Sequence, residues 1–135
     1  MIIGIGIDSI EIERVEQALR NPAFAQRLFT AAELGLPLPS IAARFAAREA
    51  VVKALGGLGR FGDSAPSLQE FEVVRTPLGA PHFRLGSRAS AALASIGVTK
   101  LHLSLTHDRA YASAFVVAEG AAPQSQGPLR EVAQH

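Results

Sequence analysis

The start of the chain, where isoleucine alternates with glycine, constrains the fold more than any other segment. Residues 2–7, Ile-Ile-Gly-Ile-Gly-Ile, predict a buried β-strand because β-branched residues favour strands. Successive side chains of a strand point to opposite faces, so one face is apolar and consists of Ile3, Ile5 and Ile7. The other face carries Gly4 and Gly6 and ends at Asp8. Two glycines on one face indicate that another backbone or a ligand approaches this strand closely.

A second constraint is the segment of residues 44–55, which predicts a helix that is almost entirely apolar apart from a few charges. Glu49 and Lys53 are four residues apart and share a helix face, and the residues expected around Glu49 are small and apolar. An uncompensated charge is unfavourable there, and a metal ion is one candidate to neutralise it. An exposed ion pair without function is the competing interpretation. Arg44 and Arg48 form another such pair, for which two solvated arginines are the default expectation.

The remaining pattern mixes helices and strands in an order typical of the α+β class. Further helices are expected over residues 9–20 and 87–96, with Ser9 capping the first and Ser40 capping the helix that ends near residue 55. Thr30 and Glu33 have the spacing of a capping box. Strands are expected over residues 71–75, 82–85, 101–106 and 111–118. We expect one small domain over residues 1–119, with an antiparallel sheet and one long central helix, and a flexible tail over residues 120–135.

Composition excludes several classes of function. The chain has 13 basic and 12 acidic residues and a formal charge of +1, so we expect neither nucleic acid nor a membrane as a partner. The absence of cysteine excludes disulfides and thiolate chemistry, and it is compatible with the cytoplasm, where we expect the protein. No window has the roughly 18 apolar residues of a membrane span, and the first residues lack the basic leader of a signal peptide.

Asp8 makes the Glu49–Lys53 pair a candidate site. Two carboxylates, completed by water and phosphate oxygens, are typical of magnesium binding, and a nearby lysine can meet a phosphate as a point charge. His107 follows the apolar face of the strand over residues 101–106, and by itself it is more typical of a hydrogen-bonded residue at the edge of the core than of a catalyst. By themselves, Arg14 and Arg27 indicate no more than surface charge.

Three segments in order resemble holo-acyl-carrier-protein synthase, the small bacterial type of 4′-phosphopantetheinyl transferase. The first is residues 4–14, Gly-Ile-Gly-Ile-Asp-Ser-Ile-Glu-Ile-Glu-Arg. The second is residues 44–56, Arg-Phe-Ala-Ala-Arg-Glu-Ala-Val-Val-Lys-Ala-Leu-Gly, in which Arg48 replaces the commoner lysine. The third is residues 103–107, Leu-Ser-Leu-Thr-His, with the strand that follows it. The similarity extends over residues 2–118, so it covers the expected domain.

The resemblance implies the fold of that family and a reaction. The family transfers 4′-phosphopantetheine from coenzyme A to a serine of apo acyl carrier protein, depends on Mg²⁺, and releases adenosine 3′,5′-bisphosphate in support of fatty acid biosynthesis. It assembles as a homotrimer with its sites at subunit interfaces. By resemblance, Asp8 and Glu49 are the magnesium ligands, and Lys53, which also belongs to the catalytic set, contacts the pyrophosphate of coenzyme A.

The resemblance also implies two surfaces around that centre. Thr106 and His107 fall in the segment that lines the coenzyme A pocket. Arg14, together with Arg27, is expected to attract the acidic carrier protein. The base that accepts the serine proton stays open between Glu49 and a magnesium-bound hydroxide.

Two other functions use the same residues. A magnesium-dependent pyrophosphohydrolase acting on a nucleotide would need the carboxylates and the lysine but no protein acceptor. A non-catalytic module that binds coenzyme A or carrier protein would show binding without turnover and no need for Asp8. Product analysis with and without apo carrier protein separates these possibilities.

Overall fold

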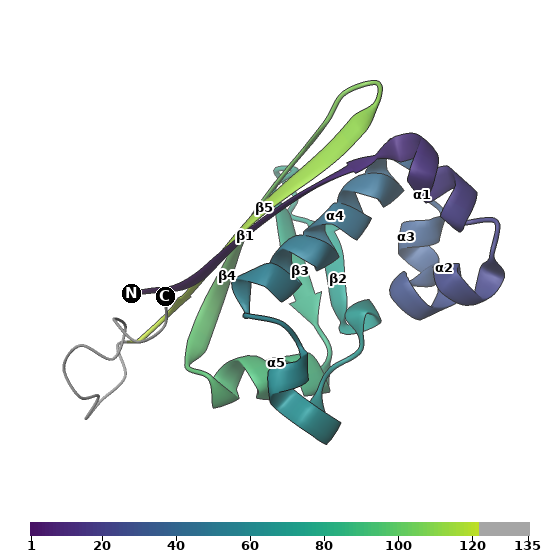
Figure 1. Cartoon of the computed structure of the whole chain (residues 1–135). Coiled ribbons are helices and arrows are strands. Elements are labelled where there is room, and N and C mark those ends of the chain that lie inside the picture. Colours follow the sequence, from purple (N-terminus) through teal and green to yellow (C-terminus); the bar gives the residue numbers. More distant parts are fainter. Residues whose placement is uncertain (122–135) are drawn as a thin grey trace.

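The fold is a three-stranded antiparallel sheet with one long helix lying across one of its faces (Figure 1), and the computed structural model describes residues 1–121. The strands of this sheet, in spatial order, are β1 (Ile2–Glu11), β5 (Tyr111–Gly120) and β4 (Val98–His107). The long helix is α4 (Leu38–Ala54). A second, two-stranded sheet pairs β2 (Phe71–Arg75) with β3 (Pro81–Leu85). The expected α+β class, antiparallel pairing and long central helix are confirmed.

Shorter elements complete the described chain. The helices α1 (Ile12–Ala18), α2 (Pro22–Leu28) and α3 (Ala31–Leu34) gather at one end of the molecule, beside the first half of α4 (Figure 1). After α4 come two 3₁₀ turns, η1 (Gly59–Ser64) and η2 (Leu68–Glu70), and after β3 comes α5 (Ser87–Ser95). Within residues 1–121, no helix is both long and apolar enough to cross a membrane. The tail expected over residues 120–135 lies, from residue 122 on, outside the described residues.

The glycine face of β1 is where α4 packs, as the alternation predicts. A Cβ atom built on Gly4 would overlap the Ala54 carbonyl oxygen, and one built on Gly6 would overlap the Ala50 carbonyl oxygen. The face that α4 presents is correspondingly small and fully buried, since Ala46, Ala47 and Ala50 are 0 % exposed. The helix backbone therefore rests directly on the strand, which brings helix side chains within reach of Asp8.

The isoleucine face of β1 is largely exposed at Ile5 and Ile7, whereas the sequence predicted a buried strand. Ile5 is 58 % exposed and Ile7 is 64 % exposed. Ile7 is paired with Phe115 of β5, which lies on the same face and is 42 % exposed. The sheet thus carries an apolar outer face, Ile5, Ile7 and Phe115, that α4 does not cover; we call it the outer face.

Two helix starts differ from the expected ones. The helix expected from Ser9 begins at Ile12, because β1 continues to pair with β5 as far as Glu11 opposite Tyr111. Ser9 does not cap it and instead lies 2.9 Å from the Ser113 hydroxyl. The expected cap at Ser40 is also wrong: the cap is Pro37 and α4 starts at Leu38, three residues earlier than expected, because proline is tolerated in a first turn.

Other local expectations are confirmed. Thr30 and Glu33 form a complete capping box at the start of α3. The helix expected over residues 44–55 ends at Ala54 with Leu55 as its C-cap, and Gly56 and Gly57 follow with φ of 76° and 92°. Helix α2 was not expected, although Asn21 caps it through its side chain and Pro22 opens it, which is a combination typical of helix starts.

Candidate active site

Asp8 and Lys53 meet where β1 passes under α4. The Lys53 ammonium donates to the Asp8 carboxylate at 3.2 Å and to the carbonyl of Ile7 at 3.0 Å. The expected partner of Lys53 was Glu49, but among the described residues its ion pair is with Asp8. The Lys53 side chain is 56 % exposed, so its ammonium faces solvent and is accessible to a ligand.

Glu49 is the second carboxylate of this centre and is partly buried. Its pKa is raised, first because burial removes water from the carboxylate and second because Asp8 is negatively charged; Lys53 offsets only part of this. The two carboxylates therefore repel each other, as expected for a pair that accepts a cation. Across residues 1–121, no three carboxylate or imidazole side chains converge, so a magnesium ion held here would take its other ligands from water and substrate.

On the other flank of α4 lies a basic cavity of about 260 Å³, which we call the arginine pocket. Its polar lining comes from Ser40, Arg44, Arg75, Thr106 and His107. Of the residues that line it, none is acidic. Two guanidinium groups and an imidazole around one cavity favour an anionic ligand.

Arg44 is buried in the wall of this pocket, which overturns the expectation of a solvated arginine. It is 4 % exposed, donates to the carbonyl of Ser40 at 3.2 Å, and has a buried Nε without a hydrogen-bond partner among the residues described. Burial lowers its pKa, an effect that the nearby Glu33 carboxylate opposes. An unsatisfied buried donor is unfavourable. An anionic group in the pocket would compensate the positive charge of Arg44, although the Nε itself is buried.

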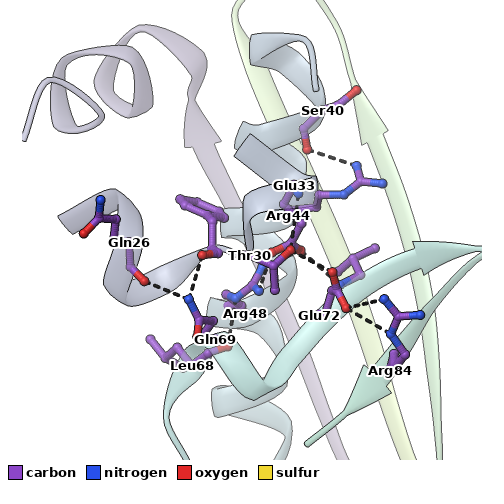
Figure 2. A network of polar contacts seen from close by, with 12 residues as sticks. Gln26, Thr30, Glu33, Ser40, Arg44, Arg48, Leu68, Gln69, Glu72 and Arg84 are labelled. Carbon is purple, nitrogen blue, oxygen red and sulfur yellow. Dashed lines mark hydrogen bonds and ion pairs between the residues drawn. The ribbon is translucent and has the colours of Figure 1, made fainter. Parts of the chain in front are cut away.

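Arg48 is likewise buried, at 1 % exposed, against the expectation of a solvated side chain. It pairs with Glu33, which is also 1 % exposed (Figure 2). The signal that could have indicated this burial was the capping-box glutamate together with the run of small alanines around Arg48 on α4. Sequence spacing alone does not bring Glu33 to Arg48.

The predicted site residues fall into two groups on opposite flanks of α4. Asp8 on β1 is paired with Ala114 of β5, which is paired with Leu105 of β4. Neighbouring strands are about 4.8 Å apart, so the β4 residues Thr106 and His107 begin about 10 Å from Asp8, with β5 and the overlying helix between them. One copy of the chain therefore joins Asp8, Glu49 and Lys53, but it does not bring Thr106 and His107 to them.

Arg14 and Arg27 are exposed on α1 and α2, at the helical end of the molecule (Figure 1). Three glutamates lie close to Arg14 in the sequence: Glu11, Glu13 and Glu16. These glutamates line a cavity with Arg109, so α1 presents mixed rather than uniformly basic charge.

Comparison with known proteins bears directly on these two flanks. The family model of the 4′-phosphopantetheinyl transferase superfamily matches residues 4–116, which include both. The chain belongs to this superfamily. A curated relative from Clavibacter michiganensis, holo-[acyl-carrier-protein] synthase, is 48 % identical over 124 residues, covering 91 % of this chain and 100 % of the relative.

Solved structures of the superfamily have the same fold. The holo-[acyl-carrier-protein] synthase of Neisseria meningitidis has a TM-score of 0.76 and 33 % identity, covering 88 % of this chain and 99 % of that one. The Helicobacter pylori synthase, solved in complex with coenzyme A, has a TM-score of 0.72 and 30 % identity, covering 85 % and 99 %. The family, the fold and the enzyme class predicted from the sequence, a 4′-phosphopantetheinyl transferase, are confirmed.

The raised pKa of Glu49 predicts that this carboxylate lowers the free energy of unfolding of the metal-free protein at neutral pH. Because the folded state binds the Glu49 proton more tightly than the unfolded state does, the ionised carboxylate opposes folding at neutral pH. Glu49→Gln should therefore raise the melting temperature of the metal-free protein at pH 7, by about 2–6 °C. The difference should shrink as the pH falls and vanish below about pH 4, where Glu49 is protonated in both states.

Thermal unfolding in a chelating buffer, followed across this pH range, measures the effect. Glu13→Gln, on the exposed face of α1, is the matched control and should change the melting temperature little at any pH. A Glu49→Gln variant that is less stable than the parent at pH 7 would contradict the environment assigned to this carboxylate.

Proposed function

We propose that this chain transfers 4′-phosphopantetheine from coenzyme A to a serine of apo acyl carrier protein at a centre built from Asp8, Glu49 and Lys53. The observation that carries this assignment is the meeting of Asp8 and Lys53 beside a partly buried Glu49 of raised pKa. Asp8 and Glu49 are the proposed magnesium ligands. When bound, the ion would supply positive charge to the pyrophosphate of coenzyme A and make its phosphorus more electrophilic.

The residues of the chain account for the proton and for the charge. The serine oxygen of the carrier attacks the β-phosphorus of coenzyme A, a new P–O bond forms, and the bond to the leaving phosphate breaks to release adenosine 3′,5′-bisphosphate. Glu49 is the proposed base that takes the serine proton, because it is the partly buried carboxylate beside the Asp8–Lys53 pair. Lys53, solvent-facing and next to Asp8, neutralises negative charge on the leaving phosphate.

The arginine pocket is the proposed receptor for another anionic group of coenzyme A. The positive charges of Arg44 and Arg75 would hold the group, and His107 and Thr106 would complete the wall. Because this pocket and the Asp8 centre lie on opposite flanks of α4, a ligand that uses both needs a second copy of the chain. We infer a homotrimer in which each site combines the β1 flank of one subunit with the β4 flank of its neighbour.

The outer face supports this assembly. Ile5, Ile7 and Phe115 together form an exposed apolar surface on the sheet that joins the two flanks. Contiguous exposed apolar surfaces of this kind mark association sites. Burying the outer face against other copies would remove it from water and bring the β1 flank of one subunit toward the β4 flank of the next.

Ile7→Asp should disrupt this assembly and the activity together. The new carboxylate would be buried among isoleucine and phenylalanine side chains, which is unfavourable without a partner. We expect multi-angle light scattering to show a trimer for the parent chain and a monomer for the variant, with transferase activity reduced by about a hundredfold or more. Leu78→Asp is the matched control, since Leu78 is 99 % exposed in the β2–β3 turn, and it should leave the oligomer intact. A fully active monomeric parent would exclude the shared site.

Arg14 and Arg27 are the proposed contacts for the acidic carrier protein. Their charges would act mainly on the rate of docking, so their contribution should weaken as salt is raised. The reaction would use coenzyme A and apo carrier protein as substrates in the cytoplasm. Its product, holo carrier protein, would support fatty acid biosynthesis.

Mass spectrometry of the carrier tests the function directly. The chain is incubated with coenzyme A, Mg²⁺ and apo acyl carrier protein, and the carrier serine is examined for added phosphopantetheine. We expect the adduct together with adenosine 3′,5′-bisphosphate, and no cleavage of coenzyme A when the carrier is omitted. Cleavage without carrier would identify a pyrophosphohydrolase. Binding without any product, using a carrier that an active synthase modifies, would identify a non-catalytic module.

A further inference from the structure

Glu33 stands at the centre of a buried polar cluster that joins four segments of the chain (Figure 2). One carboxylate oxygen accepts hydrogen bonds from the Arg48 Nη2 group at 2.7 Å and from the backbone N–H of Thr30 at 2.9 Å. The other accepts from the Arg48 Nη1 group at 2.9 Å and from the backbone N–H of Val73 at 3.0 Å. Each oxygen therefore has two donors, and Arg48 occupies both oxygens at once.

Arg48 is held as firmly as its partner. Its Nε donates to the carbonyl of Leu68 at 2.8 Å, and its guanidinium lies 5.2 Å from the ring centroid of Phe29. The planar guanidinium thus uses three of its nitrogen atoms in directed bonds, an arrangement that a lysine ammonium could not reproduce. The pair is buried, and each guanidinium nitrogen and each carboxylate oxygen has at least one hydrogen-bond partner.

Arg44 is one helical turn before Arg48 on the same side of α4. Figure 2 shows its guanidinium turned toward Ser40 and outside the Glu33–Arg48 pair. Glu33 is nonetheless close enough to stabilise the charge of Arg44 electrostatically. Two arginines thus compete for one buried carboxylate, and in this structure Arg48 holds it by two bonds while Arg44 holds it by none.

We propose that Arg48 is a positioning residue that acts through this competition: by occupying both oxygens of Glu33, it keeps Arg44 out of an internal ion pair and available to an anionic group in the arginine pocket. If Arg48 is removed, Glu33 is left with two backbone donors and an uncompensated charge. Arg44, whose charge Glu33 already stabilises, would then pair with Glu33, and this pairing would withdraw its guanidinium from the pocket. The inference deepens the proposed function, because it rests on the arginine pocket receiving an anionic group of coenzyme A.

A set of variants distinguishes this role from a purely structural one, with adenosine 3′,5′-bisphosphate as the probe and isothermal titration calorimetry as the measurement. Arg48→Met should weaken binding by about tenfold, the size of a lost charged hydrogen bond. Glu33→Gln, which removes the competing carboxylate, should leave affinity within about twofold of the parent although it disturbs the same buried cluster. The double variant Glu33→Gln/Arg48→Met should recover most of the affinity lost in Arg48→Met, although it stays less stable than the parent.

Rescue in the double variant is the decisive result, because a structural role predicts that affinity follows stability in all three variants. The proposal would be overturned if Glu33→Gln weakened binding of the probe as much as Arg48→Met does.

If Arg48→Met does not fold, Arg48→Lys replaces it. The lysine keeps the charge but cannot bond to both oxygens of Glu33, so we expect affinity to fall by about threefold and Glu33→Gln to reverse this loss. Failure of the parent chain to bind the probe, or unchanged binding in Arg44→Ala, would contradict the pocket itself. Normal binding by Arg48→Met, with weak binding by Arg44→Ala, would contradict only the role of Arg48.

Discussion

Replacing Asp8 by asparagine is expected to lower the rate of phosphopantetheine transfer by about a thousandfold, measured as kcat/KM with apo carrier protein. Asparagine has the same shape but no charge, so it would remove one of the two proposed magnesium ligands and leave Lys53 without its ion pair at 3.2 Å. The fold should tolerate the change, because asparagine has the size of aspartate and opens no cavity. The defect should therefore appear in catalysis and in the dependence on Mg²⁺, with little change in unfolding temperature.

Glu11→Asn provides the matched control, since Glu11 is the other carboxylate of β1 and lies at its exposed end. It should retain activity to within about twofold, as expected for a surface site. Glu49→Gln should behave like Asp8→Asn in the transfer assay. Full activity of either variant, with an unchanged response to Mg²⁺, would show that the metal is held elsewhere.

Replacing Gly6 by alanine should lower the stability of the fold strongly, although it adds only one methyl group. The new Cβ would overlap the Ala50 carbonyl oxygen, which belongs to the hydrogen-bonded backbone of α4 and cannot turn aside as a side chain can. Either β1 or α4 has to move as a whole. We expect a loss of about 3 kcal/mol or more in the free energy of unfolding, measured by urea denaturation, which is a large part of the stability of a typical domain.

The same displacement should separate Asp8 from Glu49, so transfer activity should fall even where the variant is folded. Gly59→Ala is the control, because a Cβ at that position meets no atom within 4 Å and Gly59 is not among the glycines with positive φ. It should change stability by no more than about 0.5 kcal/mol. If Gly6→Ala and Gly59→Ala were equally stable, β1 and α4 would have to lie farther apart than they do in this structure.

Much of the fold could be predicted because the decisive signals are local. The alternation of Gly4 and Gly6 with isoleucine predicts a close approach, and α4 is the element that makes it. The Thr30–Glu33 capping box and the glycines after Leu55 are also set by neighbours within four residues. Ser9 and Ser40 failed as predicted caps because strand pairing and proline decided where those helices begin.

The parts of the site that the sequence did not reveal depend on contacts between distant residues. Arg44 and Arg48 read as solvated charges, because their burial depends on Glu33 and on β2, which come together only in the folded chain. The pairing of Lys53 with Asp8 instead of Glu49 likewise depends on how β1 lies under α4. The separation of Asp8 and His107 on opposite flanks follows from strand order, which spacing along the chain does not encode.

The placement of functional groups on both flanks of α4 has a genetic consequence. In the proposed trimer each subunit contributes its β1 flank to one site and its β4 flank to another. A subunit defective on both flanks would therefore inactivate both sites to which it contributes, including those completed by normal subunits. In a cell that makes normal and doubly defective chains in equal amounts, activity would fall below half, and such an allele would be partly dominant. Two alleles defective on different flanks would instead restore some complete sites when they are expressed together.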